Sequence, residues 1–133
     1  MIIVLDSNEY INYIIQKSLL LDKIVPDETQ TIYINETITK EVINNLSELQ
    51  IKNFYYFLFR NKINVSYKKM PFSIFNKYKN LGLKKGDIAI AAFCDHVGAD
   101  YLISENRHFL KGIKNTKFKI VNAQQFLNQI TKE

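Results

Sequence analysis

The chain has 133 residues, a net charge of +5 and one cysteine, Cys94. This length suits a single domain, which we place over residues 1–133, and it allows one continuous hydrophobic core. No apolar run approaches the ~18 residues needed to span a bilayer, so we expect no membrane segment. A lone cysteine excludes an intrachain disulfide and a cysteine-based zinc cluster. The N-terminus has no basic region or cleavage site of a signal peptide, so we expect a cytoplasmic protein.

The first predicted elements are a strand and a helix. Met1–Leu5 is a continuous run of apolar and β-branched residues, which predicts a buried strand. Isoleucines recur at helical spacing in Asp6–Lys17, which predicts a helix. Asp6 with Glu9 has the form of a capping box at its start.

The next segments alternate in the same way. Thr31–Ile34 predicts a short strand, and Asn35 then predicts the cap of a helix that runs to about Leu49 with one apolar face. A further helix is predicted over about Ile51–Arg60 and a strand over Ile63–Tyr67.

The C-terminal half continues the alternation. It predicts helices over Phe72–Asn80, Gly86–Val97 and Ala123–Ile130, and strands at Tyr101–Ile103 and Lys119–Val121. Strands separated by helices favour a parallel sheet covered on both faces. We therefore expect an α/β fold: a three-layer α/β/α domain with a central parallel sheet of four to five strands.

The charge is distributed unevenly along the chain. Residues 1–48 hold eight acids and three bases, whereas Lys52–Lys85 holds nine bases and no acid. Such asymmetry is typical of a surface that meets a polyanion, and it is equally compatible with a solvated lysine-rich face.

Acids and polar residues follow the predicted strands, where parallel α/β sheets bind their ligands. Asp6 follows the first strand, Glu41 sits one turn into the helix after the second, and Asp87 opens the apolar helix. Ser104 and Asn106 follow a later strand. Each acid alone could be a helix cap or a solvated residue. Together, at one edge of a sheet, the three acids indicate a shared site.

Carboxylates held close together repel one another, and burial adds a desolvation cost. A divalent cation removes both penalties, and Mg²⁺ prefers hard oxygen ligands. Such an ion lowers the pKa of bound water and stabilises charge on a phosphate. The pattern thus favours metal-assisted phosphate chemistry.

Three stretches of the sequence resemble the PIN-domain nucleases. "MIIVLDSNEYI" is similar to the first strand and leading acid of that family, and "NETITKEVINNL" to its second acidic motif. "GDIAIAAFCDHVGADYLISENRHF" resembles its acid-headed, alanine-rich helix, the Gly-Ala-Asp turn and a strand ending in Ser or Thr. The resemblance covers essentially the whole chain, although about residues 50–80 carry no diagnostic motif. It implies a PIN-like fold.

The resemblance also implies roles for individual residues. Asp6, Glu41 and Asp87 would be the ligands of Mg²⁺ or Mn²⁺ and, with Asn106, the candidate catalytic residues. Family members usually carry a fourth acid in the place of Asn106, so a second metal should bind more weakly here. Groups near the metal or the scissile phosphate would be Ser7, Asn8 and Ser104.

Basic residues beside these positions are candidate substrate contacts. Arg107, next to Asn106, could clamp phosphate. Lys84 and Lys85, just before the apolar helix, could do the same or could serve solubility alone. The aromatic run Asn53–Phe59 favours core or dimer contacts over base stacking, because both sides of its helix are apolar. PIN-like proteins commonly pair, so the resemblance implies a homodimer.

Two functional hypotheses follow. The first is a divalent-metal-dependent endoribonuclease that hydrolyses RNA phosphodiester bonds, as the toxin of a toxin–antitoxin pair with a cognate antitoxin. The second is a catalytically weak or inactive PIN-like protein that binds RNA or acts as a scaffold, which Asn106 motivates. A response-regulator-like domain would need a phosphoacceptor Asp and a strand-end Lys, and we find no such pair.

Overall fold

A computed structural model describes residues 1–16, 20–25, 28–106, 109 and 116–131. Every strand predicted from the sequence is present within one or two residues of its expected ends. The strands are β1 (Ile2–Leu5), β2 (Thr31–Asn35), β3 (Asn64–Ser66), β4 (Tyr101–Ile103) and β5 (Lys119–Val121).

The five strands form one parallel sheet in the order β3-β2-β1-β4-β5. The chain therefore builds outward from β1 in one direction and then returns to add β4 and β5 on the other side. The order reverses between β1 and β4, and this is where parallel α/β sheets place their ligands.

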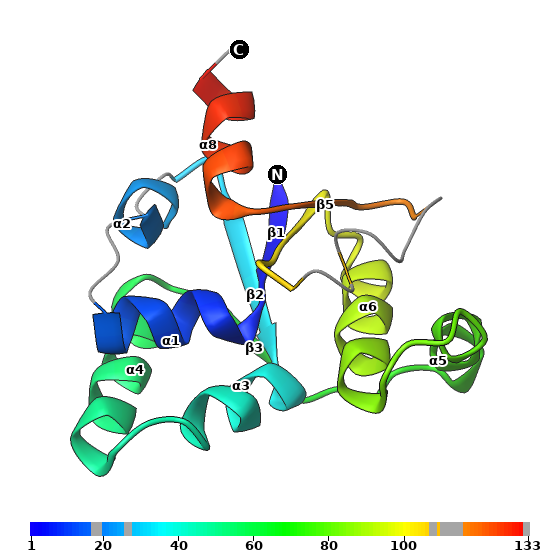
Figure 1. Cartoon of the computed structure of the whole chain (residues 1–133), viewed down its shortest axis with the longest axis horizontal. Coiled ribbons are helices and arrows are strands. Elements are labelled where there is room, and N and C mark those ends of the chain that lie inside the picture. The colour runs from blue at the N-terminus through cyan, green and yellow to red at the C-terminus, as the bar shows by residue number, and fades with distance from the viewer. Residues whose placement is uncertain (17–19, 26–27, 107–108, 110–115, 132–133) are drawn as a thin grey trace.

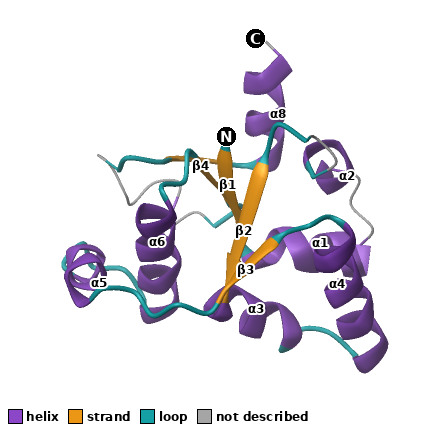
Figure 2. Cartoon of the chain, turned by 180° about the vertical axis from the view of Figure 1, so that it is seen from behind, coloured by secondary structure: helices purple, strands orange, loops and turns teal. Residues whose placement is uncertain are grey.

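Helices connect the strands and cover the sheet. They are α1 (Ser7–Gln16), α2 (Leu20–Ile24), α3 (Glu36–Ile43), α4 (Glu48–Arg60), α5 (Phe72–Lys79), α6 (Lys85–Val97) and α8 (Ala123–Thr131). In Figures 1 and 2, α1, α2 and α4 lie on one side of the sheet and α5 and α6 on the other. The expected α/β fold, three-layered with a parallel sheet of five strands, is confirmed.

Helix α3 has a special place in this arrangement. It lies at the carboxyl ends of the strands (Figure 1) and contacts both α1 and α6. Its start is fixed by Asn35, whose side chain accepts a hydrogen bond of 2.9 Å from the Ile38 N–H, as the sequence predicts. A side chain on α3 can therefore reach groups on both faces of the sheet.

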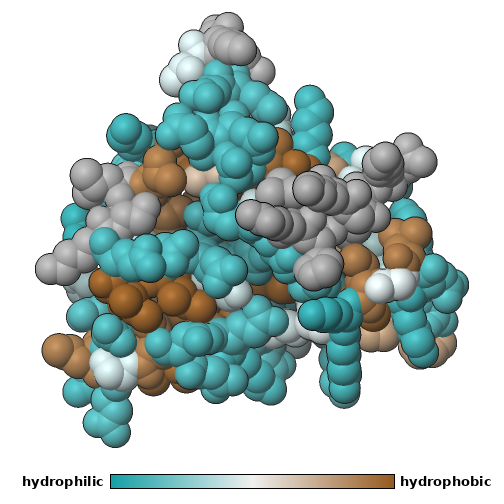
Figure 3. Space-filling view, viewed as in Figure 1, coloured by the Kyte–Doolittle hydropathy of each residue, from teal (hydrophilic) through white to brown (hydrophobic). Residues whose placement is uncertain are grey.

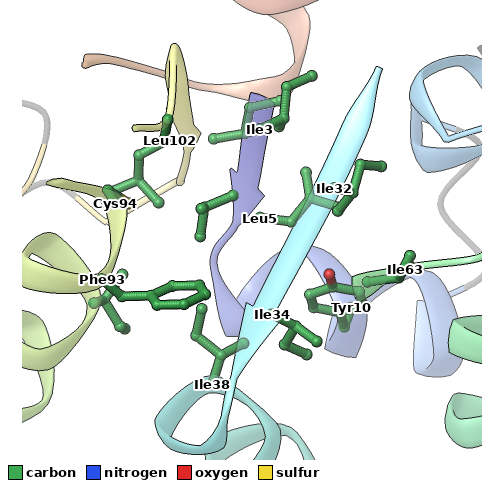
Figure 4. Close-up of a cluster of buried hydrophobic side chains, with 14 of the residues drawn as sticks. Ile3, Leu5, Tyr10, Ile32, Ile34, Ile38, Ile63, Phe93, Cys94 and Leu102 are labelled. Atoms are coloured by element: carbon green, nitrogen blue, oxygen red, sulfur yellow. The ribbon is translucent and has the colours of Figure 1, made fainter. Parts of the chain in front are cut away.

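The core is centred on β1. Ile3, Val4 and Leu5 are fully buried because neighbouring strands cover both edges and helices cover both faces. Figure 4 shows Phe93 of α6 on one side of the sheet and Tyr10 of α1 on the other. Burying a side chain of this kind contributes roughly 1.5–3 kcal/mol, so the central strand is anchored before any polar group is considered.

The predicted helix boundary near residue 50 is wrong. The helix that begins after Asn35 ends at Ile43, and α4 starts at Glu48. Ser47 caps α4 in a reciprocal capping box with Gln50. This capping box starts a new helix within the stretch whose apolar spacing predicted a single helix to about Leu49. The short helix α2 was not predicted at all.

The predicted capping box between Asp6 and Glu9 is also not formed. The Asp6 N–H donates to the Ile103 carbonyl, 2.9 Å away, which extends the pairing of β1 with β4 by one residue. The Asp6 carboxylate instead binds side chains described below. Among the described residues, no helix has both the length and the apolar character to cross a bilayer.

Candidate active site

Asp6 and Ser104 flank the point where the strand order reverses. Asp6 directly follows β1, and Ser104 directly follows β4. The Ser104 hydroxyl donates a hydrogen bond of 2.6 Å to Asp6 Oδ2, and both residues are buried. The backbone thus brings together a carboxylate and a hydroxyl that lie 98 positions apart in sequence.

Ser7 connects Asp6 to Glu41. Its backbone N–H donates to Asp6 Oδ1 at 2.7 Å, while its hydroxyl donates to Glu41 Oε2 at 2.8 Å. Glu41 lies on α3, so Ser7 joins the end of β1 to the helix that follows β2. Two acids predicted as ligands share one hydroxyl-bearing neighbour.

The start of α6 closes the site from the opposite side. A Cβ atom placed on Gly86 would lie 3.0 Å from Glu41 Oε1, closer than most real contacts of this kind. The backbone of α6 can approach the Glu41 carboxylate because Gly86 has no side chain. Asp87, the next residue, is half-buried in the first turn of α6.

Asn106 reaches the same cluster. Its side-chain amide donates to Asp87 Oδ1 at a long 3.4 Å, and its backbone N–H donates to the Ser104 hydroxyl at 3.0 Å. The four candidate catalytic residues are therefore linked through Ser7 and Ser104. They come from β1, α3, α6 and the segment after β4.

Burial and mutual repulsion perturb these acids. Burial raises the pKa of Asp6, and the hydrogen bonds from Ser104 and Ser7 oppose this rise only in part. Burial also raises the pKa of Glu41; the Ser7 hydrogen bond lowers it, and the negative charges of Asp6 and Asp87 raise it again. The Glu41 carboxylate is thus close enough to Asp6 and Asp87 to feel both of their charges.

The donor set suits a divalent cation. As the side chains of the described residues stand, no three His, Cys, Asp or Glu residues are arranged to hold a metal ion. The oxygens of Asp6 and Glu41 instead accept hydrogen bonds from the two serines. Partly buried carboxylates with raised pKa values, such as Asp6 and Glu41, are nevertheless hard oxygen ligands that Mg²⁺ or Mn²⁺ would stabilise in the charged form. The residues fit such an ion by chemistry, with some rearrangement of these hydrogen bonds.

Glu9 also belongs to this neighbourhood, although the sequence did not predict it. Its side chain is buried on α1, and Oε1 has no hydrogen-bond partner among the residues that the structure describes. Burial, followed by the charges of Glu105 and Asp6, raises the pKa of Glu9 to about 8. The sequence pattern predicted Glu9 as the partner of Asp6 in a capping box. Its position three residues after Asp6 was the signal that could have identified it as a neighbour of the acidic cluster.

The remaining candidates lie around the cluster. Asn8 is exposed on the first turn of α1, and Lys84 and Lys85 are exposed at the start of α6, beside Asp87. Arg107 lies outside the described residues. Glu105 is exposed, and its Oε1 accepts a 3.4 Å hydrogen bond from the Ala123 N–H at the start of α8.

Two further aspartates, Asp95 and Asp100, lie away from the site. Asp95 binds Lys77 and the Tyr78 hydroxyl of α5 at 3.1 and 2.8 Å. Asp100 accepts a hydrogen bond from the Ile2 N–H, at the amino end of β1. Both acids hold elements together, and neither reaches the carboxyl edge of the sheet.

Comparisons with known proteins bear on the fold. No protein-family model and no curated protein sequence matches the chain. Among solved structures, VapBC-1 from nontypeable Haemophilus influenzae matches with a TM-score of 0.70 and 20% identity, over 93% of this chain and 99% of that one.

VapBC2 from Rickettsia felis, bound to a DNA fragment from its promoter, matches with a TM-score of 0.63 and 17% identity, over 92% of this chain and 98% of that one. The VapC component of such complexes is a PIN-domain protein. The similarity extends over nearly the whole of both chains and includes the parallel sheet with its flanking helices. The chain therefore has a VapC-like PIN fold.

Proposed function

We propose that the protein is a divalent-metal-dependent endoribonuclease that hydrolyses RNA phosphodiester bonds. One observation carries the proposal: Asp6, Glu41 and Asp87 lie near one another at the carboxyl edge of the sheet. The backbone N–H of Ser7 binds Asp6 and its hydroxyl binds Glu41, and the negative charges of Asp6 and Asp87 both act on Glu41. Because these acids come from three separate elements, a purely local explanation such as helix capping does not account for their meeting.

The residues of the chain would divide the work. Asp6, Glu41 and Asp87 would hold Mg²⁺ or Mn²⁺, and Asn106 would add an uncharged oxygen or support a water molecule. When bound, the ion would make water a better nucleophile and offset charge on the phosphate. Ser7 and Ser104 would orient the carboxylates, and Lys84, Lys85, Asn8 and Arg107 would contact the RNA backbone.

A cleavage assay tests this proposal. The purified protein is stripped of metal and incubated with labelled single-stranded RNA, with and without Mn²⁺ or Mg²⁺. We expect cleavage only with metal and a loss of at least about 100-fold in Asp6→Asn, since an amide removes a charged ligand. Glu48→Gln, an exposed acid at the start of α4, is the matched control and should cleave normally. Undiminished cleavage by Asp6→Asn would mean that the activity belongs to a contaminant or another site.

The second candidate is a PIN-like protein that binds RNA or acts as a scaffold without efficient catalysis. Asn106 favours it, because an amide in this place leaves one carboxylate fewer to hold cations. The same assay separates the two functions. RNA binding with no cleavage in either metal would favour the scaffold.

The cellular role we propose is that of a toxin with a cognate antitoxin, in line with the VapBC complexes that share its fold. We also propose that two copies of the chain form a homodimer through the apolar region over α1 and beside α4 (Figure 3). On α4, Phe54 and Phe57 face the core, whereas Tyr56 and Phe59 are 65% and 84% exposed. A small gene adjacent to this one, whose product co-purifies with the protein, would support the toxin assignment. A monomer in solution would argue against the homodimer.

A further inference from the structure

A pocket of about 280 Å³ opens beside the acidic cluster, between β3, α3, α5 and α6. Its floor is apolar and includes Phe93 and Ala89 of α6. The rim includes Tyr67 and Phe72, which are 74% and 76% exposed. Its size is near the lower end of the roughly 300–1,000 Å³ of small-ligand pockets, which suits one flat ring system better than a larger molecule.

The rim combines aromatic rings with positive charge. Lys68 and Lys69 are exposed and lie between the two rings in sequence. They belong to the stretch Lys52–Lys85, which holds nine bases and no acid. One acid, Glu36, also borders the pocket, and its carboxylate is paired with Lys40 at 2.9 Å. Aromatic faces interleaved with lysines are the surface that single-stranded nucleic acid binds, through base stacking and phosphate contacts.

The pocket is lined by residues of the two helices that carry Glu41 and Asp87. Thr37 lines it and precedes Glu41 by one turn on the same side of α3, about 6 Å along the helix axis at 1.5 Å per residue. Ala89 lines it and follows Asp87 by two residues, about 3 Å along the axis of α6 and on a different side of that helix. A strand of RNA whose phosphate lies at the acids could therefore place a neighbouring base in this pocket.

We propose that the pocket is a subsite for one unpaired base of a single-stranded RNA, next to the scissile phosphate. Tyr67 and Phe72 stack on the base, and Lys68 and Lys69 contact the backbone beside it. The inference rests on the proposed ribonuclease function and extends it: the strand is unpaired at this position, because a base that remains stacked and paired in a duplex cannot enter a pocket between two aromatic side chains.

Binding in EDTA tests the subsite without requiring catalysis. Labelled single-stranded oligoribonucleotides are titrated with the wild type, Tyr67→Ala and Phe72→Ala, and anisotropy is recorded. Each alanine variant should bind roughly 5- to 100-fold more weakly, the effect of losing one base stack. Tyr67→Phe keeps the ring and should bind as the wild type. Leu49→Ala, an exposed apolar residue at the start of α4 and away from the pocket, is the control.

A second RNA series locates the base. Oligonucleotides that lack a single base at successive positions are compared with the intact strand. At one position near the cleavage site, removal of the base should abolish most of the difference in RNA affinity between the wild type and Tyr67→Ala. Circular dichroism of each variant confirms that the fold is retained, so that a loss of binding is not a loss of structure.

Each outcome has a distinct meaning. Metal-dependent cleavage with normal binding by Tyr67→Ala and Phe72→Ala overturns the subsite and leaves the nuclease intact. Ring-dependent binding without cleavage supports the subsite and overturns the nuclease. If the two variants lose affinity for a protein partner while keeping affinity for RNA, the pocket is a protein-docking site and the proposal is wrong. A wild type that binds no single-stranded RNA overturns both proposals.

Discussion

The Ser104 hydroxyl lies 2.6 Å from Asp6 Oδ2, at the ends of the neighbouring strands β4 and β1, between which the strand order reverses. Ser104 is fully buried, and its own N–H donates to the Val121 carbonyl of β5. The hydroxyl is thus fixed by the sheet and opposes the rise in the pKa of Asp6 that burial causes. The Ser104 side chain thus helps to hold the Asp6 carboxylate in place and favours its ionised form.

Ser104→Ala should therefore damage both stability and activity. Loss of a buried hydrogen bond to a carboxylate should lower the free energy of unfolding by about 1–3 kcal/mol, measured in urea. The pKa of Asp6 should rise further, so the acidic limb of the cleavage–pH profile should move to higher pH. Ser104→Thr retains the hydroxyl, so its acidic limb should lie at the same pH as that of the wild type. An unmoved profile in Ser104→Ala would show that this hydroxyl does not tune Asp6.

Gly86→Ala should reduce activity without reducing stability. The added methyl group would lie 3.0 Å from Glu41 Oε1, so the carboxylate must move by a few tenths of an ångström. We expect metal-dependent cleavage to fall by about tenfold, because ligand geometry is sensitive to small displacements. Alanine favours a helix over glycine, so the free energy of unfolding should stay level or rise by up to about 1 kcal/mol. Reduced stability with normal cleavage would contradict this account.

Much of the fold follows from short-range patterns in the sequence. The apolar, β-branched runs at β1 and β4 predict buried parallel strands, and the ends of such strands must share one edge. That constraint places Asp6 and Ser104 at the same edge of the sheet, and the pairing of β1 with β4 then brings them into contact. Glu41 and Asp87 then follow from their positions at the starts of the next helices.

Other features depend on tertiary contacts that no local pattern contains. The break between α3 and α4 lies within a regular apolar spacing, and the decisive signal is the pair Ser47 and Gln50, which competes with that spacing. The raised pKa of Glu9 comes in part from the charge of Glu105, which follows β4 and is distant in sequence. The pocket near Tyr67 requires α3, α5 and α6 to converge.

Asn106→Asp should convert the cluster to four acids. Asn106 lies 3.4 Å from Asp87, so a carboxylate there would add repulsion without metal and a ligand with metal. In EDTA the melting temperature should fall, by an amount equivalent to about 1 kcal/mol. Added Mn²⁺ should raise it more than in the wild type, and the metal concentration for half-maximal cleavage should drop severalfold. Identical metal titrations for the two proteins would show that position 106 does not face the cation.

Glu9→Gln should stabilise the protein in alkaline solution. The ordinary pKa of this carboxyl is 4.5, and in the fold it rises to about 8, mainly through burial. The folded chain therefore keeps a proton that the unfolded chain releases above pH 4.5. The contribution of protonated Glu9 to the free energy of unfolding is therefore fully present below pH 4.5, and it is lost as the pH rises towards 8.

Glutamine keeps the shape of the protonated side chain and cannot ionise. At pH 8 in EDTA, Glu9→Gln should unfold with a free energy higher than that of the wild type by ~1–3 kcal/mol, and the difference should shrink as the pH is lowered towards the unfolded-state pKa of 4.5. Urea unfolding at several pH values measures both. Glu48→Gln, on the surface of α4, should show no such pH-dependent gain. If the curves for Glu9→Gln and the wild type run parallel between pH 5 and 8, then Glu9 ionises alike in the folded and unfolded chain, and its burial beside Asp6 has no electrostatic consequence.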